Sequence, residues 1–590
     1  MQSSSLAVDF LSRPYLVLKH ESLRQYYSQH EEKCNSADWS QSRLNPANRV
    51  NSLDTSSSKW RVDGATACAT QFFIVPLDLL HDLEPLRIDV FIRDQLQHPP
   101  HLREDLGSNL SVSLQNNRAL ARLGISRHLC RALDEQCLQD PSFLTRYRKL
   151  PFGSRLVFTS INSNPQKMEL LVLPAFDLER EALSVRSLQT SWPDIPREQW
   201  PEVVDLSHLR FVHQIHESIT LVHLVDEVVE GGRQFVFKSN TEHLTYLYNE
   251  LRFLLRCPPH PNIMSAPIRL VTKRSNFGGK VGVFGFLLPY YSQGSIRDIL
   301  PSLSPKNRLK ICLEVTAAMI HICERCKTFY SDLRPDNVLF SSEPHSRAVL
   351  CDFEQRGNHY DWCPPEVLPS LYLENIQSSN DEGALRKLEE WVHIIKGLSH
   401  TKHSPSSQRS LSKEGGHSLN RPWASLGRFQ QESAMVYALG LFIYAIFEGL
   451  GDLQRGVLHS YPTDSNSIFP QMRHAPLRVR EIIWKCTRSA PEWGGNEWSA
   501  KEFSANTNRL SQKGGYIVRT EMDHSSQSIH TPIQVTMDDI INSALQWWRA
   551  KLAWVNDALG NPSNKNNWGS DRPRLREVLT ALQDINIDDI

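Results

Sequence analysis

Short runs of apolar residues mark strands in the middle of the chain. The runs LRFVHQI (209–215), ITLVHLVD (219–226) and RQFVFKS (233–239) are rich in β-branched and aromatic residues, a composition typical of strands. The paired glycines of EVVEGG, between the second and third runs, permit a tight turn. The pattern therefore predicts three consecutive strands.

A helical period follows the third run. In TEHLTYLYNELRFLLRC (241–257), leucines at 244, 247, 251 and 254 recur on one face, and PPHPNI ends the pattern. Two more strands are predicted at 268–271 and 281–288. Beyond them, an apolar stripe predicts a long helix; it consists of Leu309, Cys312, Val315, Met319 and Ile322. The chain thus predicts an α+β fold in which a strand-rich part precedes a helical part.

The first 204 residues carry weaker patterns. Residues 1–60 are rich in Ser, Gln and Asn without a sustained period, which predicts a loosely ordered segment. We interpret residues 61–204 as an N-terminal domain of unknown type. It contains QFFIVPLDLL as a strand or buried turn, leucines at helical spacing in 113–138, and a hairpin of SRLVFTSI (154–161) and KMELLVLP (167–174). This domain either binds a partner or packs on the strand-rich part.

Two polar stretches interrupt the helical part. Residues 367–430 include SHTKHSPSSQRSLSKEGGHSLNRP, and residues 488–570 include a polar tract from Pro491 to about His530. Segments of this composition bury little apolar surface, so both are predicted to be surface insertions.

The charge balance excludes some classes of protein. The chain has 590 residues with 65 Lys and Arg against 65 Asp and Glu, so its formal net charge is zero. A neutral chain lacks the overall basic charge used in nonspecific nucleic-acid binding, and no nucleic-acid partner is expected. The longest apolar stretch, 434–447, is shorter than the roughly 20 residues of a membrane span, so none is expected.

The cysteines and the N-terminus favour an intracellular protein, cytoplasmic or nuclear. The 11 cysteines are odd in number and irregularly spaced, which fits a reducing compartment, and the first residues show no signal or transit pattern. His321, Cys323 and Cys326 lie close in sequence, but no second pair of ligands adjoins them. We therefore interpret these cysteines as buried thiols rather than zinc ligands.

Charged and polar motifs follow one another in a fixed order from residue 236 onward. They are VFK (236–238), Glu250, YSDLRPDN (330–337), DFE (352–354), CPPE (363–366), MVYALG (435–440) and RP (572–573). In this order they resemble the signature of the eukaryotic protein kinase superfamily, with its V-A-I-K, H-R-D-L-x-x-x-N, D-F-G and A-P-E motifs.

The resemblance covers residues 205–590 and implies a bilobal, Ser/Thr-kinase-like fold. A strand-rich small lobe would occupy about 205–288 and a helical large lobe about 289–590, with an N-terminal extension before them. The implied activity is transfer of the γ-phosphate of ATP to a protein hydroxyl, with Mg²⁺ as cofactor. The protein substrate or partner stays unidentified at this point.

The resemblance also assigns roles to the matching residues. Lys238 would hold the α- and β-phosphates, and Glu250 would fix Lys238 by an ion pair. Asp332 would accept or orient the proton of the substrate hydroxyl. Arg334 takes the position of the lysine near the transferred phosphate, so it keeps the positive charge but changes its geometry.

Further positions are implied for the metal, the adenine and the structural contacts. Asn337 and Asp352 would bind Mg²⁺, because Mg²⁺ prefers oxygen ligands. At the connection between the lobes, Leu288 would border the adenine pocket and Tyr291 would contribute to adenine recognition through backbone groups, or these residues would simply pack the junction. A structural ion pair is implied between two distant residues, Glu366 and Arg572.

The sequence departs from the kinase pattern at several positions. Residues 213–222 contain no glycine where kinases have a glycine-rich loop over the phosphates. Ser331 replaces the arginine of H-R-D, Glu354 replaces the glycine of D-F-G, and Met435 replaces the aspartate that opens D-V-W-S-L-G. A pseudokinase that binds nucleotide or partners without turnover is the main alternative, and a small-molecule kinase is the third reading.

Overall fold

A computed structural model describes about half of the chain. The described residues are 59–65, 71–77, 88–92, 123–160, 165–225, 233–241, 243–276, 278–341, 346–355, 362–367, 421–424, 426–455, 468–469, 472–488, 490, 509–513, 516–522, 528–531, 536, 538–539, 541–542, 569 and 571–586. They fall into two compact units. One unit contains the described residues up to Arg256 and Ser265–Tyr290, and the other contains Cys257–Met264 and those from Tyr291 onward.

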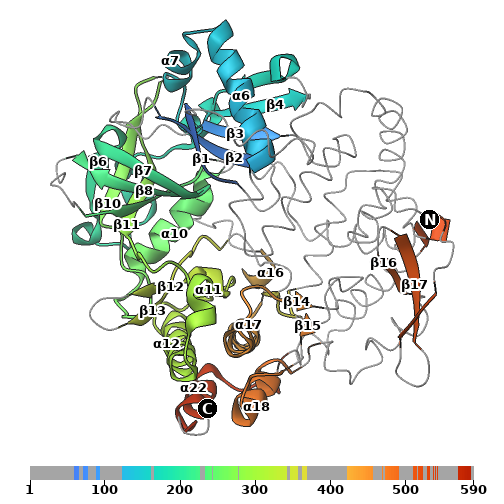
Figure 1. Ribbon diagram of the computed structural model, residues 1–590. Helices are drawn as coiled ribbons and strands as arrows, with labels where there is room; N and C mark the ends of the chain where they lie inside the picture. The colour runs from blue at the N-terminus through green and yellow to red at the C-terminus, as the bar shows by residue number, and fades with distance from the viewer. Residues whose placement is uncertain are drawn as a thin grey trace, which may run out of the picture. The chain divides into compact units, whose positions relative to one another are not determined.

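The first unit begins with a five-stranded sheet in the order β1-β2-β3-β4-β5 (Figure 1). Its strands are β1 (Trp60–Ala65), β2 (Gln71–Pro76), β3 (Ile88–Ile92), β4 (Arg155–Ser160) and β5 (Glu169–Leu173), and two helices, α6 (Leu123–Gln139) and α7 (Phe143–Arg148), accompany them. The core between sheet and helices includes Phe72, Ile74, Leu129, Leu133 and Phe158. The predicted hairpin is confirmed as β4 and β5, which pair antiparallel. Of the segment 1–60 that was predicted to be loosely ordered, residues 1–58 lie outside the described residues, and Trp60 begins β1.

A second, mixed sheet of six strands follows in the order β6-β10-β11-β9-β8-β7. Its strands are β6 (Glu202–Asp205), β7 (Leu209–His216), β8 (Ile219–Leu224), β9 (Phe235–Ser239), β10 (Arg269–Arg274) and β11 (Val281–Pro289). Helix α10 (Leu244–Arg256) buries the four leucines of its predicted face. All predicted strands from 209 to 288 are therefore confirmed, whereas β6, which pairs parallel with β10, was not predicted.

Short elements connect these two sheets. They are η6 (Pro165–Lys167), α8 (Phe176–Glu181), α9 (Val185–Ser191), η7 (Arg197–Gln199) and η8 (Leu206–His208).

Polar contacts join the two sheets at strand β7, an edge strand of the six-stranded sheet. The buried Asp63 carboxylate on β1 accepts a hydrogen bond from the Gln214 backbone N–H at 2.7 Å. The Arg61 guanidinium donates to the Val212 carbonyl at 2.8 Å and pairs with Asp63 at 2.5 Å. These bonds satisfy backbone groups of an edge strand. The N-terminal domain thus packs on the strand-rich part, one of the two alternatives left open by the sequence.

The second unit is mainly helical. Its elements are α11 (Ile296–Ile299), η10 (Leu300–Ser302), α12 (Pro305–Glu324), η11 (Pro335–Asn337), β12 (Val338–Ser341), β13 (Arg347–Leu350), α16 (Arg421–Ala424), α17 (Arg428–Glu448), β14 (Gln454–Arg455), β15 (Ile468–Phe469), α18 (Leu477–Cys486), β16 (Arg509–Lys513), β17 (Tyr516–Met522), β18 (Ser528–Thr531) and α22 (Leu575–Gln583). Helix α12 contacts α17 and α22, and α18 contacts both α17 and α22.

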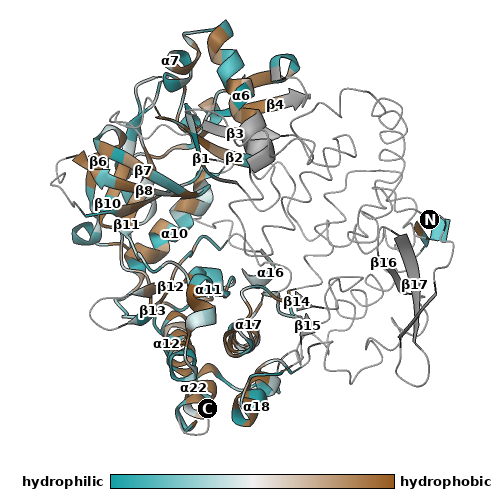
Figure 2. Cartoon of the chain, in the orientation of Figure 1, coloured by the Kyte–Doolittle hydropathy of each residue, from teal (hydrophilic) through white to brown (hydrophobic). Residues whose placement is uncertain are grey.

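Helix α17 forms the centre of this helical group, and Figure 2 shows it as predominantly apolar. Every residue from Ser433 to Phe447 is buried. Gly440 permits close packing on α18, because a Cβ at this position would clash with Cys486 and Thr487. None of the helices in the described part of the chain combines the length and apolar character that a membrane span requires.

Parts of the predicted insertions contain regular structure. Strands β16, β17 and β18 form a three-stranded sheet within the tract that the sequence analysis treated as a polar insertion. The predicted insertion 367–430 includes α16 and the start of α17. Residues 368–420, including most of its Ser-rich stretch, lie outside the described residues.

Candidate active site

A buried ion pair joins the strand lysine to the helical glutamate. Lys238 Nζ on β9 lies 2.5 Å from a carboxylate oxygen of Glu250 on α10, and the two side chains are 4% and 1% exposed. Neighbouring strand β11 passes close by, since Gly285 has no Cβ to clash with the Phe237 ring and the Lys238 carbonyl. The structure therefore brings together the two residues that the motif order had paired across 12 positions of sequence.

The two candidate adenine residues lie at the end of strand β11 and just beyond it. Leu288 is buried and pairs with Val236 of β9, and the strand extends to Pro289. The connection, predicted to begin at Leu288, therefore begins two residues later, at Tyr290. Tyr291 belongs to the second unit and is half-buried, and burial raises the pKa of its phenol. The side chains of Leu288 and Tyr291 both provide apolar contact surface.

In the second unit, the loop 330–337 is held by buried hydrogen bonds at its start. The Tyr330 hydroxyl donates to the Cys351 carbonyl at 2.6 Å. Burial raises the pKa of Tyr330 well above its usual value, so the phenol stays protonated and remains a donor. The loop ends in the short helix η11, where the Asn337 N–H bonds to the Arg334 carbonyl at 3.0 Å.

Asn337 and Asp332 form the centre of this loop. The Asn337 side-chain Nδ2 donates to both the backbone carbonyl and the carboxylate Oδ2 of Asp332, each at 2.8 Å. Because both bonds use the amide nitrogen, the amide oxygen Oδ1 is left as a ligand atom. The five-residue spacing thus places a carboxylate and an amide oxygen in one rigid loop.

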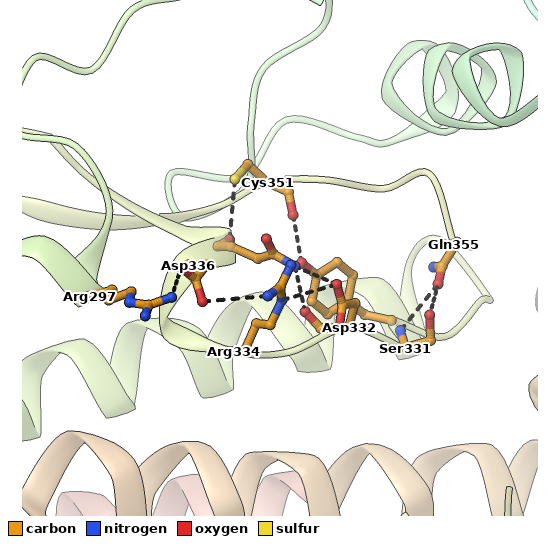
Figure 3. Close-up of polar contacts among 9 residues, drawn as sticks. Arg297, Ser331, Asp332, Arg334, Asp336, Cys351 and Gln355 are labelled. Carbon is orange, nitrogen blue, oxygen red and sulfur yellow. Dashed lines mark hydrogen bonds and ion pairs between the residues drawn. The ribbon is translucent and has the colours of Figure 1, made fainter. Parts of the chain in front are cut away.

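Arg334 lies among carboxylates of the same loop (Figure 3). Its guanidinium is 3.3 Å from Asp332 and 3.5 Å from Asp336, and Asp336 also bonds to Arg297 at 2.9 Å. Burial lowers the pKa of Arg334, but Asp332, Asp336 and Asp352 raise it by more, so the net shift is upward. The arginine is therefore a fixed positive charge beside the candidate catalytic aspartate.

Asp352 follows a short antiparallel hairpin. Strands β12 and β13 pair from Val338 with Leu350 onward, and the Cys351 N–H donates to the Asn337 carbonyl at 3.0 Å. Asp352 is therefore the residue that follows the backbone contact between Cys351 and Asn337. Asp352 has a left-handed backbone with φ of +62°, a conformation that costs non-glycine residues energy and that clusters at functional sites.

The donor set in this unit fits a hard divalent cation. Asp352 offers a carboxylate and Asn337 an amide oxygen, both from backbone positions fixed by the hairpin and by η11. Mg²⁺ characteristically binds through one or two carboxylates, other oxygens and phosphate groups. The residues present therefore fit the metal that the motif order implies.

Ser331, at the position where the resemblance implies an arginine, makes a neutral hydrogen-bonded contact that was not predicted from sequence. Gln355 Oε1 accepts from the Ser331 backbone N–H at 3.2 Å and from its hydroxyl at 2.6 Å, while Nε2 donates to the Phe329 carbonyl at 2.7 Å. Ser331 and Gln355 are both buried. Figure 3 shows the two side chains side by side. Two polar residues near the motifs, 24 apart, are too weak a sequence signal to predict this contact.

Replacing Gln355 with methionine is expected to lower the free energy of unfolding by about 1–3 kcal/mol, because the buried Ser331 N–H and hydroxyl lose their acceptor. Gln355 has a left-handed backbone with φ of +56°, and methionine keeps the unbranched shape of the side chain without changing the cost of that conformation. Chemical denaturation of the full chain measures the effect, and exposed Gln583→Met is the matched control. A loss within about 0.5 kcal/mol of that control would contradict the proposed contact.

Glu366 and Arg572 form a buried ion pair, as the resemblance implied. Arg572 Nη1 lies 2.5 Å from Glu366, and each side chain is 1% exposed. The guanidinium also donates to the carbonyls of Ser433 at 3.1 Å and Arg488 at 2.9 Å, and it lies 4.8 Å from the Tyr437 ring centroid. The pair thus ties α17 to the segments that precede and follow it.

The turn between β7 and β8 departs from a glycine-rich loop. His216 pairs with Ile219, so only Glu217 and Ser218 form the turn. The Ser218 carbonyl accepts the Ser239 N–H at 2.9 Å, which ties the turn to the end of β9. Side chains at both turn positions limit how closely the backbone could approach a phosphate.

Comparison with known proteins adds no relative. No model of a protein family matches the chain, and no curated protein matches its sequence. The interpretation of the site therefore depends on the order of its motifs and on the geometry described above.

Proposed function

We propose that this chain is an ATP- and Mg²⁺-dependent phosphotransferase of protein-kinase type that transfers the γ-phosphate to a protein hydroxyl, of Ser or Thr. In this proposal the six-stranded sheet and α10 form a small lobe, and the helical unit forms a large lobe. Protein kinases of this type act where ATP is abundant, so the proposal includes an intracellular location.

The observation that carries the proposal is the Asn337 amide, which donates to both the backbone and the carboxylate of Asp332. This arrangement holds a candidate base and a candidate metal ligand in one loop. The neighbouring hairpin supplies Asp352 next to the backbone partner of Asn337. Phosphoryl transfer needs little more than such positioning and electrostatic stabilisation.

Each residue has a defined task in this proposal. Asp332 orients the acceptor hydroxyl and takes its proton, and Arg334 stabilises charge on the phosphate being transferred. Lys238 binds phosphate oxygens, and Glu250 keeps its ammonium in place. Asn337 and Asp352 hold the metal. Bound Mg²⁺ supplies the positive charge that neutralises the phosphates.

A pseudokinase is favoured by one specific observation, the two-residue turn at Glu217 and Ser218. Glu217 brings a negative charge to a turn that would lie near phosphates, and the Ser218 carbonyl is already bonded to strand β9. Such a turn offers few free backbone N–H groups to a nucleotide. In this alternative the chain keeps the fold and binds nucleotide or a partner without turnover.

Label transfer from γ-labelled ATP tests the proposal. Purified full-length chain is incubated with Mg²⁺ or Mn²⁺, a basic protein and, separately, small hydroxyl compounds. Asp352→Asn is compared with Asp584→Asn, which makes the same change at an exposed carboxylate after α22. The expected result is label on Ser and Thr of protein, lost in Asp352→Asn and retained in Asp584→Asn.

Other outcomes separate the alternatives. Stabilisation of the folded chain by ATP without any label transfer would identify a pseudokinase. Label found only on the small hydroxyl compounds would identify a small-molecule kinase. If ATP neither stabilises the folded chain nor donates label, both the kinase and the nucleotide-binding pseudokinase are contradicted.

A further inference from the structure

Two segments of the second unit bring cysteine and histidine side chains together. One segment is Cys257–His260, which follows α10, and the other is His321–Cys326, at the end of α12. Ligand atoms of Cys257, His321 and Cys326 all lie within 4.8 Å of one another. From sequence, the cluster of His321, Cys323 and Cys326 was interpreted as buried thiols because no second pair of ligands adjoins it. In the structure, Cys257, 64 residues before His321, joins His321 and Cys326.

Local backbone structure holds both segments. Pro258 and Pro259 end the helical period and start a turn, in which the Ile263 N–H bonds to the His260 carbonyl at 3.2 Å. At the end of α12, the Arg325 and Cys326 N–H groups both bond to the His321 carbonyl, at 2.8 and 3.1 Å. Lys327 then reverses the chain with a φ of +55°. Cys326 is therefore folded back against His321.

The two sulfurs are in hydrogen-bond contact, at a separation nearer to that of two ligands on one cation than to that of a covalent bond. Cys257 Sγ lies 3.3 Å from Cys326 Sγ. A disulfide requires about 2.05 Å. Two thiolates on one tetrahedral Zn²⁺, each at about 2.3 Å, lie roughly 3.8 Å apart, so a shift of about half an ångström would admit the metal.

His321 has the orientation of a zinc ligand, and the ring of His260 lies beside it. One ring nitrogen of His321, Nε2, lies 2.9 Å from the Pro258 carbonyl. Zinc-binding histidines typically donate one ring N–H to a carbonyl in this way, which leaves the other nitrogen for the metal. The His260 ring lies 4.8 Å from the His321 ring, centroid to centroid. The two pairs, C-x₂-H and H-x₄-C, have spacings typical of zinc sites.

We propose that Cys257, His321 and Cys326 bind one Zn²⁺, with His260 as the fourth ligand. Two thiolates and two neutral imidazoles balance the charge of the cation. All four side chains are half-buried, so the metal can enter from solvent. A filled site has no open position for a substrate, so its role is structural: it fixes the segment after α10 to the end of α12. His260 Nδ1 accepts a hydrogen bond from the Asn262 N–H at 3.2 Å, and this bond must break if Nδ1 is to bind the metal.

Metal content tests the site independently of phosphate transfer. Full-length chain, purified under reducing conditions with zinc, is dialysed, and its zinc is measured by elemental analysis. The variants Cys257→Ser and Cys326→Ser are compared with Cys323→Ser, which changes a half-buried thiol of α12 outside the cluster. Replacing zinc with Co²⁺ reports the ligands directly, because thiolate-to-cobalt charge transfer and tetrahedral geometry have characteristic absorption spectra.

The expected result is one zinc per chain in wild type and in Cys323→Ser, and none in the two other cysteine variants. Tetrahedral Co²⁺ spectra with thiolate bands are expected in the same two proteins. His260→Ala is expected to weaken zinc affinity by at least about tenfold. Zinc-free wild-type protein that is folded, a Cys257–Cys326 disulfide under these conditions, or full zinc content in Cys257→Ser would overturn the site. Unchanged affinity in His260→Ala would overturn the assignment of the fourth ligand.

Discussion

Replacing Asp332 with asparagine is expected to slow phosphate transfer by about 10²- to 10⁴-fold, the usual contribution of a positioned general base. Asparagine keeps the shape of the side chain, and its Oδ1 can still accept the 2.8 Å bond from the Asn337 amide. The KM for ATP is expected to change little, because the proposed function places Asp332 at the acceptor hydroxyl and not at ATP. Initial rates of label transfer, with ATP and acceptor varied separately, measure both parameters.

A purely structural role for Asp332 makes a different prediction. Loss of structure would lower the thermal stability of the chain and reduce its ATP affinity together with the rate. Asp584→Asn serves again as the exposed control, with unchanged rates. A rate in Asp332→Asn within about tenfold of wild type would contradict the assignment of Asp332 as the base.

Replacing Arg572 with methionine is expected to lower the free energy of unfolding by about 3–5 kcal/mol, because the buried Glu366 loses its charge partner. Methionine retains most of the unbranched stem, so the loss reports the charge and its hydrogen bonds more than the packing. Chemical denaturation monitored by tryptophan fluorescence measures the change. The nearby exposed pair of Arg574 with Glu432 provides the matched control, since its arginine is 47% exposed.

The control and a double variant make this prediction specific. Arg574→Met is expected to cost about 0–1 kcal/mol, as exposed ion pairs do. The double variant Glu366→Met with Arg572→Met is expected to be more stable than Arg572→Met alone, because no buried charge remains unpaired. Equal losses in Arg572→Met and Arg574→Met would contradict a buried, coupled pair. If Arg572→Met does not fold, the milder Glu366→Gln tests the same contact.

Elements with a strong periodic pattern were predictable from sequence. Strands β7 to β9 carry β-branched and aromatic runs, and α10 carries four leucines on one face, so short-range pattern was enough. Strand β6 was not predictable because its four residues, EVVD, become a strand only by pairing with β10, more than 60 residues later. Strands β16–β18 pair with their neighbours in sequence, and they were missed because they lie in a tract that was interpreted as a polar insertion.

The candidate site was predictable where local spacing sets the geometry. Asp332 and Asn337 lie in one loop, so their contact follows from a five-residue spacing. Lys238 with Glu250 and Glu366 with Arg572 were paired only through the resemblance, and both pairs are now seen as buried contacts. Contacts made by neutral side chains carry no such signal. The contact between Gln355 and Ser331 was therefore not predictable from sequence and is seen only in the structure.

The N-terminal domain illustrates a further limit of sequence reasoning. Arg61 and Asp63 are two polar residues in a weakly patterned strand, and nothing near them indicates a partner. Their bonds to β7 join positions 151 residues apart. Contacts between polar side chains and backbone groups at this separation depend on how two sheets are packed, which no local pattern encodes.

The metal dependence of phosphate transfer by the unmodified chain tests the central claim most directly. Folded full-length protein is incubated with γ-labelled ATP and a basic acceptor protein, with Mg²⁺ present in one arm and removed by a chelator in the other. The expected result is label on the acceptor with Mg²⁺ and none without it, because the proposed function assigns Asn337 and Asp352 to the metal. Folded protein that transfers no label with Mg²⁺ would contradict the proposed function.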